Sequence, residues 1–112
     1  MARRTRAYHH HVYVVEFAID VLREPRFLRA NPDYMHRRPC VYVGMTGLSP
    51  DERFANHKQG IKSSALAERF GIRLLPELYA HLNPMPFEAA VQMEKDLTED
   101  LRRAGYTVVG GH

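Results

Sequence analysis

Two short runs of β-branched and aromatic residues set the framework of this chain. The first, VYVVEFAI, covers residues 12–19 and alternates with the period of two that a strand requires, with Tyr13 on one face. The second, CVYVG, covers residues 40–44 and lies between Pro39 and Gly47. Each run has the length and residue types of a strand, so we expect both to pair in a sheet.

Three later segments carry the start and stop signals of helices. Ser49, followed by a proline and two acids, predicts a helix that continues to about Gly60. SSALAERFG, residues 63–71, repeats the design with a serine start and a glycine stop. The longest helix is expected over about residues 86–104, with Gly105 after it. Helices therefore follow the second strand.

The remaining segments complete the expected fold. Residues 20–39 contain three prolines and five arginines without a sustained period, which predicts a long connection that can hold a short helical turn. IRLLPELY, residues 72–79, is compatible with an edge strand interrupted by Pro76, and YTVV, residues 106–109, with a final strand. We therefore predict one α/β domain of the α+β type over residues 1–112, with a mixed, mainly antiparallel sheet of three to four strands and about three helices.

Composition limits the class of protein. A length of 112 residues gives room for one modest core, and 45% hydrophobic residues are typical of a globular domain. Sixteen Lys and Arg against thirteen Asp and Glu give a formal net charge of +3, which permits a polyanionic partner without requiring one. A single cysteine, Cys40, cannot form an internal disulfide, and no window reaches the ~20 apolar residues of a membrane span. We expect a cytoplasmic protein outside the membrane.

One carboxylate falls on the apolar side of the last helix. At about 100° per residue, Glu94 lies in the same stripe as Ala90, Met93, Leu97, Leu101 and Ala104. A buried carboxylate without a partner is costly, so we expect Glu94 to meet a cation, hydrogen-bond donors or water in a cleft. Periodicity leaves two interpretations open: a structural ion pair, and an oxygen ligand for a hard divalent cation.

Four further polar residues are candidates only in combination. Arg53 and His57 are spaced i and i+4, so they share one helix face, which is also what a solvated polar face would show. Tyr13 and Tyr42 each lie inside an apolar strand, where a tyrosine is usually a core residue whose hydroxyl reaches a partner. None of these residues identifies a site by itself.

Taken in order, these motifs resemble the GIY-YIG nuclease superfamily. HVY, residues 11–13, stands for the first family motif, and YVG, residues 42–44, stands for the second. The resemblance places the family arginine at Arg53 and the histidine at His57, and the segment AAVQMEKDL places the family glutamate at Glu94. The match runs over nearly the whole chain in the expected order, as for a stand-alone catalytic domain.

The resemblance implies a metal-dependent endonuclease that hydrolyses DNA phosphodiester bonds. Glu94 would bind one Mg²⁺ or Mn²⁺, with phosphate oxygen and water in the remaining positions. Arg53 would stabilise the charge that develops on phosphorus, and Tyr13 would act as the base, provided that nearby cations lower its pKa. Tyr42 and His57 would position water or substrate, or relay the proton.

Further substrate contacts are expected near the second motif and in the basic connection. Gly44 would let the chain turn beside a phosphate, and Thr46 fits the family segment that follows. Arginines of the connection would grip phosphates, although solvated loops are also arginine-rich; they are Arg23, Arg26, Arg29, Arg37 and Arg38. The expected partner is DNA, branched or nicked, in repair, recombination or defence, together with a partner protein or a second copy of the chain.

Two other classes of function stay open. His11 occupies the place of the family's glycine and Met45 that of a lysine in several relatives, which favours a nucleic-acid-binding module that retains the fold without cutting. The complete set of Tyr13, Tyr42, Arg53, His57 and Glu94 favours an enzyme. In the third class, an interaction domain, the same residues would form a structural polar network.

Overall fold

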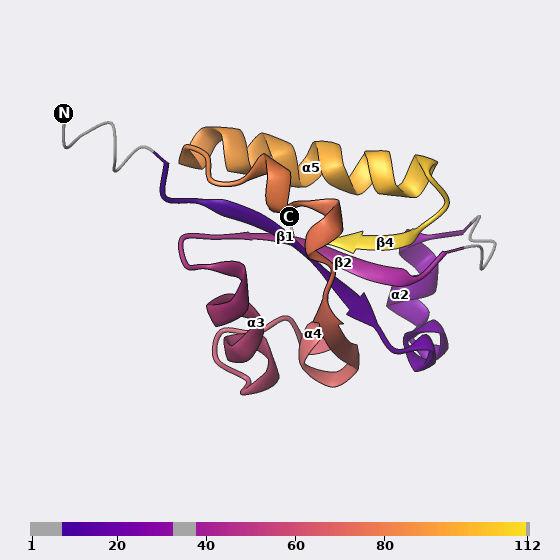
Figure 1. Ribbon diagram of the computed structural model, residues 1–112. Helices are drawn as coiled ribbons and strands as arrows, with labels where there is room; N and C mark the ends of the chain where they lie inside the picture. Colours follow the sequence, from indigo (N-terminus) through magenta and orange to yellow (C-terminus); the bar gives the residue numbers. More distant parts are fainter. Residues whose placement is uncertain (1–7, 33–37, 112) are drawn as a thin grey trace, which may run out of the picture.

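The computed structural model describes residues 8–32 and 38–111 and contains a four-stranded mixed sheet (Figure 1). The strands are β1 (His11–Phe17), β2 (Cys40–Thr46), β3 (Gly71–Leu74) and β4 (Thr107–Gly110). Their order in the sheet is β3-β1-β2-β4. Strand β1 is antiparallel to both β2 and β3, whereas β2 and β4 are parallel. The two strands that carry the tyrosines therefore lie side by side at the centre.

Helices cover both faces of this sheet. Among the described residues the α-helices are α2 (Pro25–Ala30), α3 (Pro50–Lys58), α4 (Ala65–Phe70) and α5 (Phe87–Arg103). The same described residues also form three short 3₁₀ helices, one after β1 and two after β3: η1 (Ile19–Arg23), η2 (Pro76–Leu78) and η3 (Ala80–Leu82). Helix α5 lies along one face, whereas α3 and α4 lie against the opposite face (Figure 1). No helix in this part of the chain is long and apolar enough to cross a membrane.

The predicted fold class is confirmed, with local corrections. The first strand ends at Phe17 rather than residue 19, because the chain turns at Ala18 and Ile19 is 62% exposed. The second strand does not end at Gly44 but continues to Thr46, since its pairing with β1 extends through His11 opposite Thr46. The connection over residues 20–39 contains a complete short helix, α2.

The helix signals form as the sequence predicts. The Ser49 hydroxyl accepts the Glu52 amide hydrogen at 3.2 Å, while the Glu52 carboxylate accepts the Ser49 amide hydrogen at 3.1 Å. Gly105 follows α5 with φ +102°, a left-handed value that suits glycine. The capping contacts between Ser49 and Glu52 fix where α3 begins, and hence which of its residues face the sheet.

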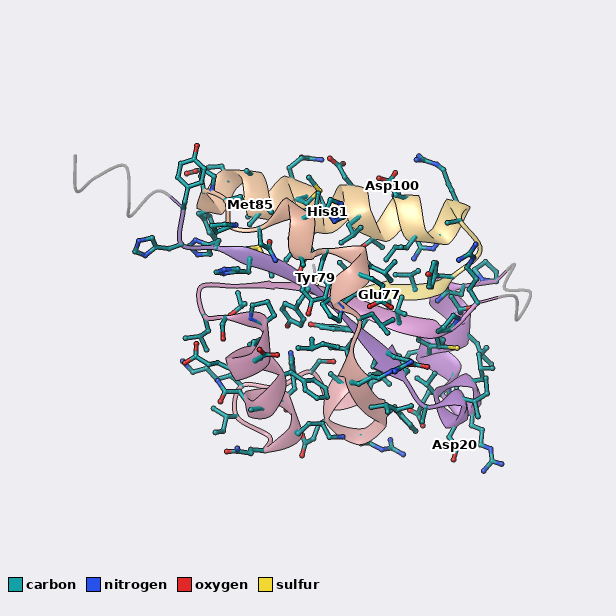
Figure 2. All side chains as sticks on the ribbon, in the orientation of Figure 1. Asp20, Glu77, Tyr79, His81, Met85 and Asp100 are labelled. Atoms are coloured by element: carbon teal, nitrogen blue, oxygen red, sulfur yellow. The ribbon has the colours of Figure 1, made fainter. Side chains whose placement is uncertain are left out.

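Side chains fill the space between the sheet and the helices on both faces (Figure 2). The core is built from the valines of β1 and β2 with Phe27, Leu97 and Leu101 from the helices. Asp20 and Asp100 are exposed and lie at the outside in the same view. The apolar stripe of α5 is therefore packed on the sheet, which carries Glu94 inward.

Two asparagine side chains continue the strand pairing where no strand is present. Asn31 accepts the Val108 amide hydrogen at 2.9 Å and donates to the Val108 and Phe27 carbonyls at 2.8 and 3.1 Å. Asn83 accepts the Val12 amide hydrogen at 2.8 Å and donates to the Val12 carbonyl at 2.7 Å. These amides bond to backbone groups of β4 and β1, and the Val108 carbonyl also accepts from Arg102 Nη2 at 3.0 Å.

Candidate active site

The side chain of Tyr13, a residue of β1, extends over the neighbouring strand β2. Its direct partner in β2 is Gly44, and a Cβ added at Gly44 would lie 2.5 Å from the Tyr13 hydroxyl oxygen. Only glycine leaves room for the ring at this point. Tyr13 is 1% exposed, so the aromatic ring belongs to the core while its hydroxyl reaches α3.

The Tyr13 hydroxyl meets His57, which is fully buried on the inward face of α3. The Tyr13 Oη to His57 Nε2 distance is 2.8 Å. The other ring nitrogen, Nδ1, accepts the Ser64 amide hydrogen at 3.1 Å. A backbone N–H can only donate, so Nδ1 carries the lone pair and the neutral ring holds its proton on Nε2. His57 therefore donates its hydrogen bond to Tyr13.

His57 stays neutral in this setting. Burial, together with the nearby positive charge of Arg53, lowers the pKa of His57 to about 4. The imidazole is consequently uncharged near pH 7. A neutral ring whose Nε2 already holds a proton cannot accept one from Tyr13 at that nitrogen, so the hydrogen bonding favours positioning over proton relay for His57.

Both tyrosines have a pKa above the usual range. Burial is the largest cause for Tyr13, followed by the negative charge that Tyr42 would carry, whereas Arg53 acts in the lowering direction. For Tyr42, burial again dominates and the negative charge of Glu94 adds to the rise. Arg53 therefore lowers the pKa of Tyr13, as expected of a nearby cation. In the absence of a metal ion, this lowering is smaller than the rise that burial causes.

Arg53 holds the loop that follows its own helix. Its Nη1 donates to the Ile61 carbonyl at 3.2 Å, and its Nη2 donates to the Lys62 carbonyl at 2.7 Å. Each terminal nitrogen of a guanidinium carries two hydrogens, so both nitrogens keep one for another acceptor. Arg53 can therefore fix the loop and present charge at the same time.

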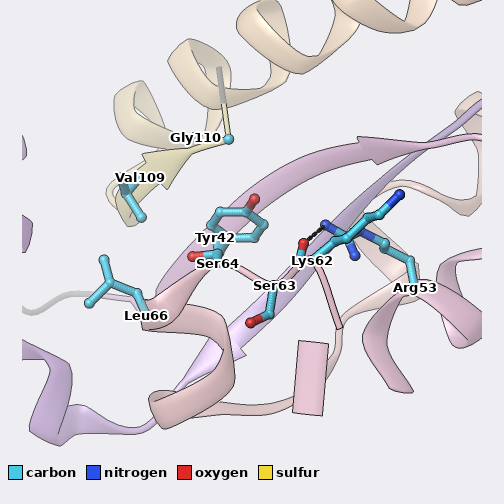
Figure 3. A pocket seen from close by; sticks show the side chains of 9 residues that line it. Tyr42, Arg53, Lys62, Ser63, Ser64, Leu66, Val109 and Gly110 are labelled. Carbon is cyan, nitrogen blue, oxygen red and sulfur yellow. Dashed lines mark hydrogen bonds between the residues drawn. The ribbon is translucent and has the colours of Figure 1, made fainter. Parts of the chain in front are cut away.

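A pocket of about 360 Å³ opens beside Tyr42 and Arg53 (Figure 3). One side is formed by the loop between α3 and α4, and the other by the end of β4. The full lining is Tyr42, Arg53, Lys62, Ser63, Ser64, Leu66, Val109, Gly110 and Gly111. Two cationic side chains thus share an opening with the Tyr42 ring, which suits an anionic ligand.

Glu94 approaches the same region from α5. It is 5% exposed, as its place in the apolar stripe predicts, and the other four acids of this helix are exposed. A Cβ added at Gly111 would lie 3.2 Å from Glu94 Oε2 and 2.6 Å from the Tyr42 hydroxyl oxygen. Gly111 also lines the pocket, and the absence of a side chain there lets the Glu94 carboxylate and the Tyr42 hydroxyl both lie close to its backbone.

The donors at this point suit a hard cation better than a soft one. No group of three or more His, Cys, Asp and Glu side chains that could enclose a metal occurs within residues 8–32 and 38–111. Mg²⁺ is commonly held by only one or two carboxylates, with waters and substrate phosphates in its other positions. A single carboxylate, Glu94, close to Gly111 at the edge of the pocket fits that kind of site, and a closed tetrahedral zinc centre does not fit it.

Of the five predicted catalytic residues, Tyr42 and Arg53 line the pocket, whereas Tyr13, His57 and Glu94 do not. The other predicted substrate contacts that the structure describes are also absent from the lining. Gly44 contacts the Tyr13 ring, and the Thr46 hydroxyl accepts the Leu48 amide hydrogen at 3.0 Å. The described arginines of the connection lie in η1, α2 and the approach to β2, the last of them over the Tyr106 ring; they are Arg23, Arg26, Arg29 and Arg38. Arg37 falls outside the described residues. These DNA contacts stay predictions.

Sequence reasoning missed the second wall of the pocket. Lys62, Ser63 and the Ser64 backbone come from the connection between α3 and α4, where only the serine helix start carries a recognisable signal. The glycines at the end of β4 were likewise not among the predicted site residues. Both segments reach the site through contacts between distant parts of the chain, which local patterns do not encode.

Comparison of the chain with models of protein families, with curated proteins and with solved structures gives no match.

Proposed function

We propose that this protein is a metal-dependent endonuclease of the GIY-YIG type that hydrolyses DNA phosphodiester bonds. The observation that carries the proposal is convergence. Tyr13 from β1, Tyr42 from β2 and His57 from α3 are joined by a hydrogen bond and ring contacts. Arg53 from α3 lines a pocket with Tyr42, and Glu94 from α5 approaches that pocket at Gly111. Five residues from four elements far apart in sequence supply a base, a cation and an oxygen ligand in one place.

Each residue has a role that follows from its contacts. Glu94 would hold Mg²⁺ or Mn²⁺, which when bound would act as a Lewis acid on the phosphate. Arg53 lines the pocket and keeps guanidinium hydrogens for phosphate oxygens, where a fixed positive charge stabilises the transition state. Arg53 and Lys62, the two cationic residues of the pocket lining, would then lie close to the bound phosphate.

Tyr13 is the proposed base that accepts a proton from the attacking water. Because His57 donates from Nε2 to the Tyr13 hydroxyl oxygen, its hydrogen bond stabilises the phenolate more than the phenol. Tyr42 lies at the pocket with its ring centroid 5.6 Å from that of His57, and would orient water or phosphate. His57 and Tyr42 are therefore assigned to positioning.

The proposed substrate is DNA, with branched or nicked forms as the first to test. A second copy of the chain or a partner protein is the proposed source of additional DNA contacts. The proposed compartment is the cytoplasm.

A second candidate is a nucleic-acid-binding module that does not cut. The raised pKa of Tyr13 favours it, since a phenol that stays protonated near neutral pH is a poor base. The cations of the pocket would bind phosphate equally well in such a module.

The deciding experiment offers supercoiled plasmid, together with nicked, flap and branched oligonucleotides, to the purified chain with Mg²⁺ or Mn²⁺. Glu94→Gln keeps the shape of the buried side chain and removes its charge, while Glu99→Gln makes the same change at an exposed position of α5. Arg53→Ala is compared with Arg69→Ala, an exposed arginine of α4. We expect metal-dependent cleavage that Glu94→Gln and Arg53→Ala abolish and the two control variants retain.

Cleavage that persists in Glu94→Gln would contradict the proposed role of that residue. Tight DNA binding without cleavage of any of the offered substrates, with either metal, would contradict the nuclease proposal and support the binding module.

A further inference from the structure

Lys62 occupies a backbone conformation that its residue type does not favour. Its φ is +48°, in the left-handed region where glycine and asparagine are the common choices. Gly60, two residues earlier, has φ +77° and is the expected residue for such a turn. A lysine at this position gains nothing for the turn itself, so its side chain is the feature that needs an explanation.

The backbone of Lys62 is fixed from α3. Arg53 Nη2 donates to the Lys62 carbonyl at 2.7 Å, and Nη1 donates to the preceding carbonyl of Ile61. Two residues further on, the Ser64 amide is bonded to His57. Arg53 and His57 of α3 thus bind the backbone of this loop at residues 61, 62 and 64. These hydrogen bonds hold Lys62 at the edge of the pocket.

Lys62 is one of the residues that line the pocket, and its side chain runs beside that of Arg53 (Figure 3). The chain has two other lysines. The Lys58 ammonium donates to the Glu68 and Gly71 carbonyls at 2.9 Å each, and Lys95 is exposed on α5. The ammonium of Lys62 has no hydrogen bond or ion pair with the residues that the structure describes. It is therefore available for a ligand at the pocket.

We propose that Lys62 is a DNA-binding residue of the site, whose ammonium contacts a backbone phosphate held in the pocket beside Arg53. This assignment rests on the proposed function in taking DNA as the ligand. In the proposed function Arg53 binds the reacting phosphate, so Lys62, which lines the same pocket, would contact that phosphate or the one next to it along the strand. An ammonium on a flexible stem suits this task, because it binds phosphate as a point charge without fixed geometry.

The test measures equilibrium binding of a fluorescent oligonucleotide over a range of salt concentrations, without metal, so that no cleavage occurs. Lys62→Asn removes the charge and suits the left-handed backbone, while Lys62→Arg keeps the charge. Lys95→Gln is the matched control on α5. Removing one phosphate contact should weaken binding and reduce the slope of log affinity against log salt by about 0.7 to 0.9. Thermal unfolding of Lys62→Asn should match that of the unmodified chain.

The expected result is a reduced slope in Lys62→Asn alone, with Lys62→Arg and Lys95→Gln unchanged. An unchanged slope in Lys62→Asn overturns the assignment even if the protein cleaves DNA. If the unmodified chain binds DNA but cleaves none, a reduced slope in Lys62→Asn supports the assignment of Lys62 as a DNA-binding residue. That outcome contradicts only the proposed nuclease activity. Absence of any DNA binding by the unmodified chain overturns both proposals.

Discussion

Asn31 and the Tyr13–His57–Tyr42 cluster are both buried polar groups, but they are satisfied in different ways. Asn31 uses its oxygen and both amide hydrogens on the backbone of α2 and β4. In the cluster, side chains bond mainly to one another, and Tyr42 opens onto a pocket with two cations. Asn31 has no donor left for a ligand, whereas the cluster ends at an opening. We infer that the first serves stability and the second serves chemistry.

The largest effect should follow removal of Asn31. Asn31→Ala leaves the Val108 amide and the Phe27 carbonyl without their side-chain partner, so we expect a loss of about 4 kcal/mol in the free energy of unfolding. Urea denaturation measures it. Asn56→Ala, in α3, is the control and should change stability by less than about 0.5 kcal/mol. A loss below about 1 kcal/mol for Asn31→Ala would contradict the inference that Asn31 serves stability.

His57 should make the cluster sensitive to acid. The folded chain holds the pKa of His57 at about 4, against about 6.5 for an unfolded chain. Between these values the unfolded chain binds a proton that the folded chain does not, so stability falls as pH decreases from 6.5 to 4. The loss should reach about 3 kcal/mol relative to His57→Gln. Parallel stability curves for the two proteins across this range would contradict the assignment.

The pH dependence of cleavage should report Tyr13. Its pKa lies above the usual range, so only a small fraction is phenolate near neutral pH, and that fraction grows tenfold for each pH unit. We expect the single-turnover cleavage rate to rise by about tenfold per unit between pH 6 and pH 9, or about 1.4 kcal/mol per unit. A rate that is level from pH 7 upward would exclude Tyr13 as the base.

The smallest effect should come from adding a side chain at Gly111. The Cβ of Gly111→Ala would press on the Tyr42 hydroxyl and approach Glu94, so we expect about fivefold slower cleavage at limiting metal, or about 1 kcal/mol. Gly47→Ala adds a Cβ at an ordinary 3.5 Å from His10 and is the control. Equal metal dependence in both variants would separate Gly111 from the site.

Local signals predicted much of the fold and the inward carboxylate. Ser49 and Ser64 cap the helices that they were expected to start, and Glu94 is buried because its spacing places it among the apolar residues of α5. Helical period and capping chemistry act over a few residues, so a sequence shows them directly.

Other features depend on contacts between distant segments. The Ser64 amide sets the proton position on His57, and Asn31 bonds to Val108, 77 residues away in the chain. Gly44 marked the second motif, but its purpose, to admit the Tyr13 ring, appears only once the register of β1 and β2 is known. Lys62 carried no signal at all, because its position is set by Arg53.

The most direct test of the difference between the two regions is Tyr13→Phe, assayed in parallel for plasmid nicking with Mg²⁺ and for urea stability. Removal of one hydroxyl from a buried ring should change the free energy of unfolding by about 1 kcal/mol. Loss of the base should slow nicking by at least about 100-fold. Nicking at the rate of the unmodified protein, or a stability loss as large as that of Asn31→Ala, would contradict a catalytic role for this cluster.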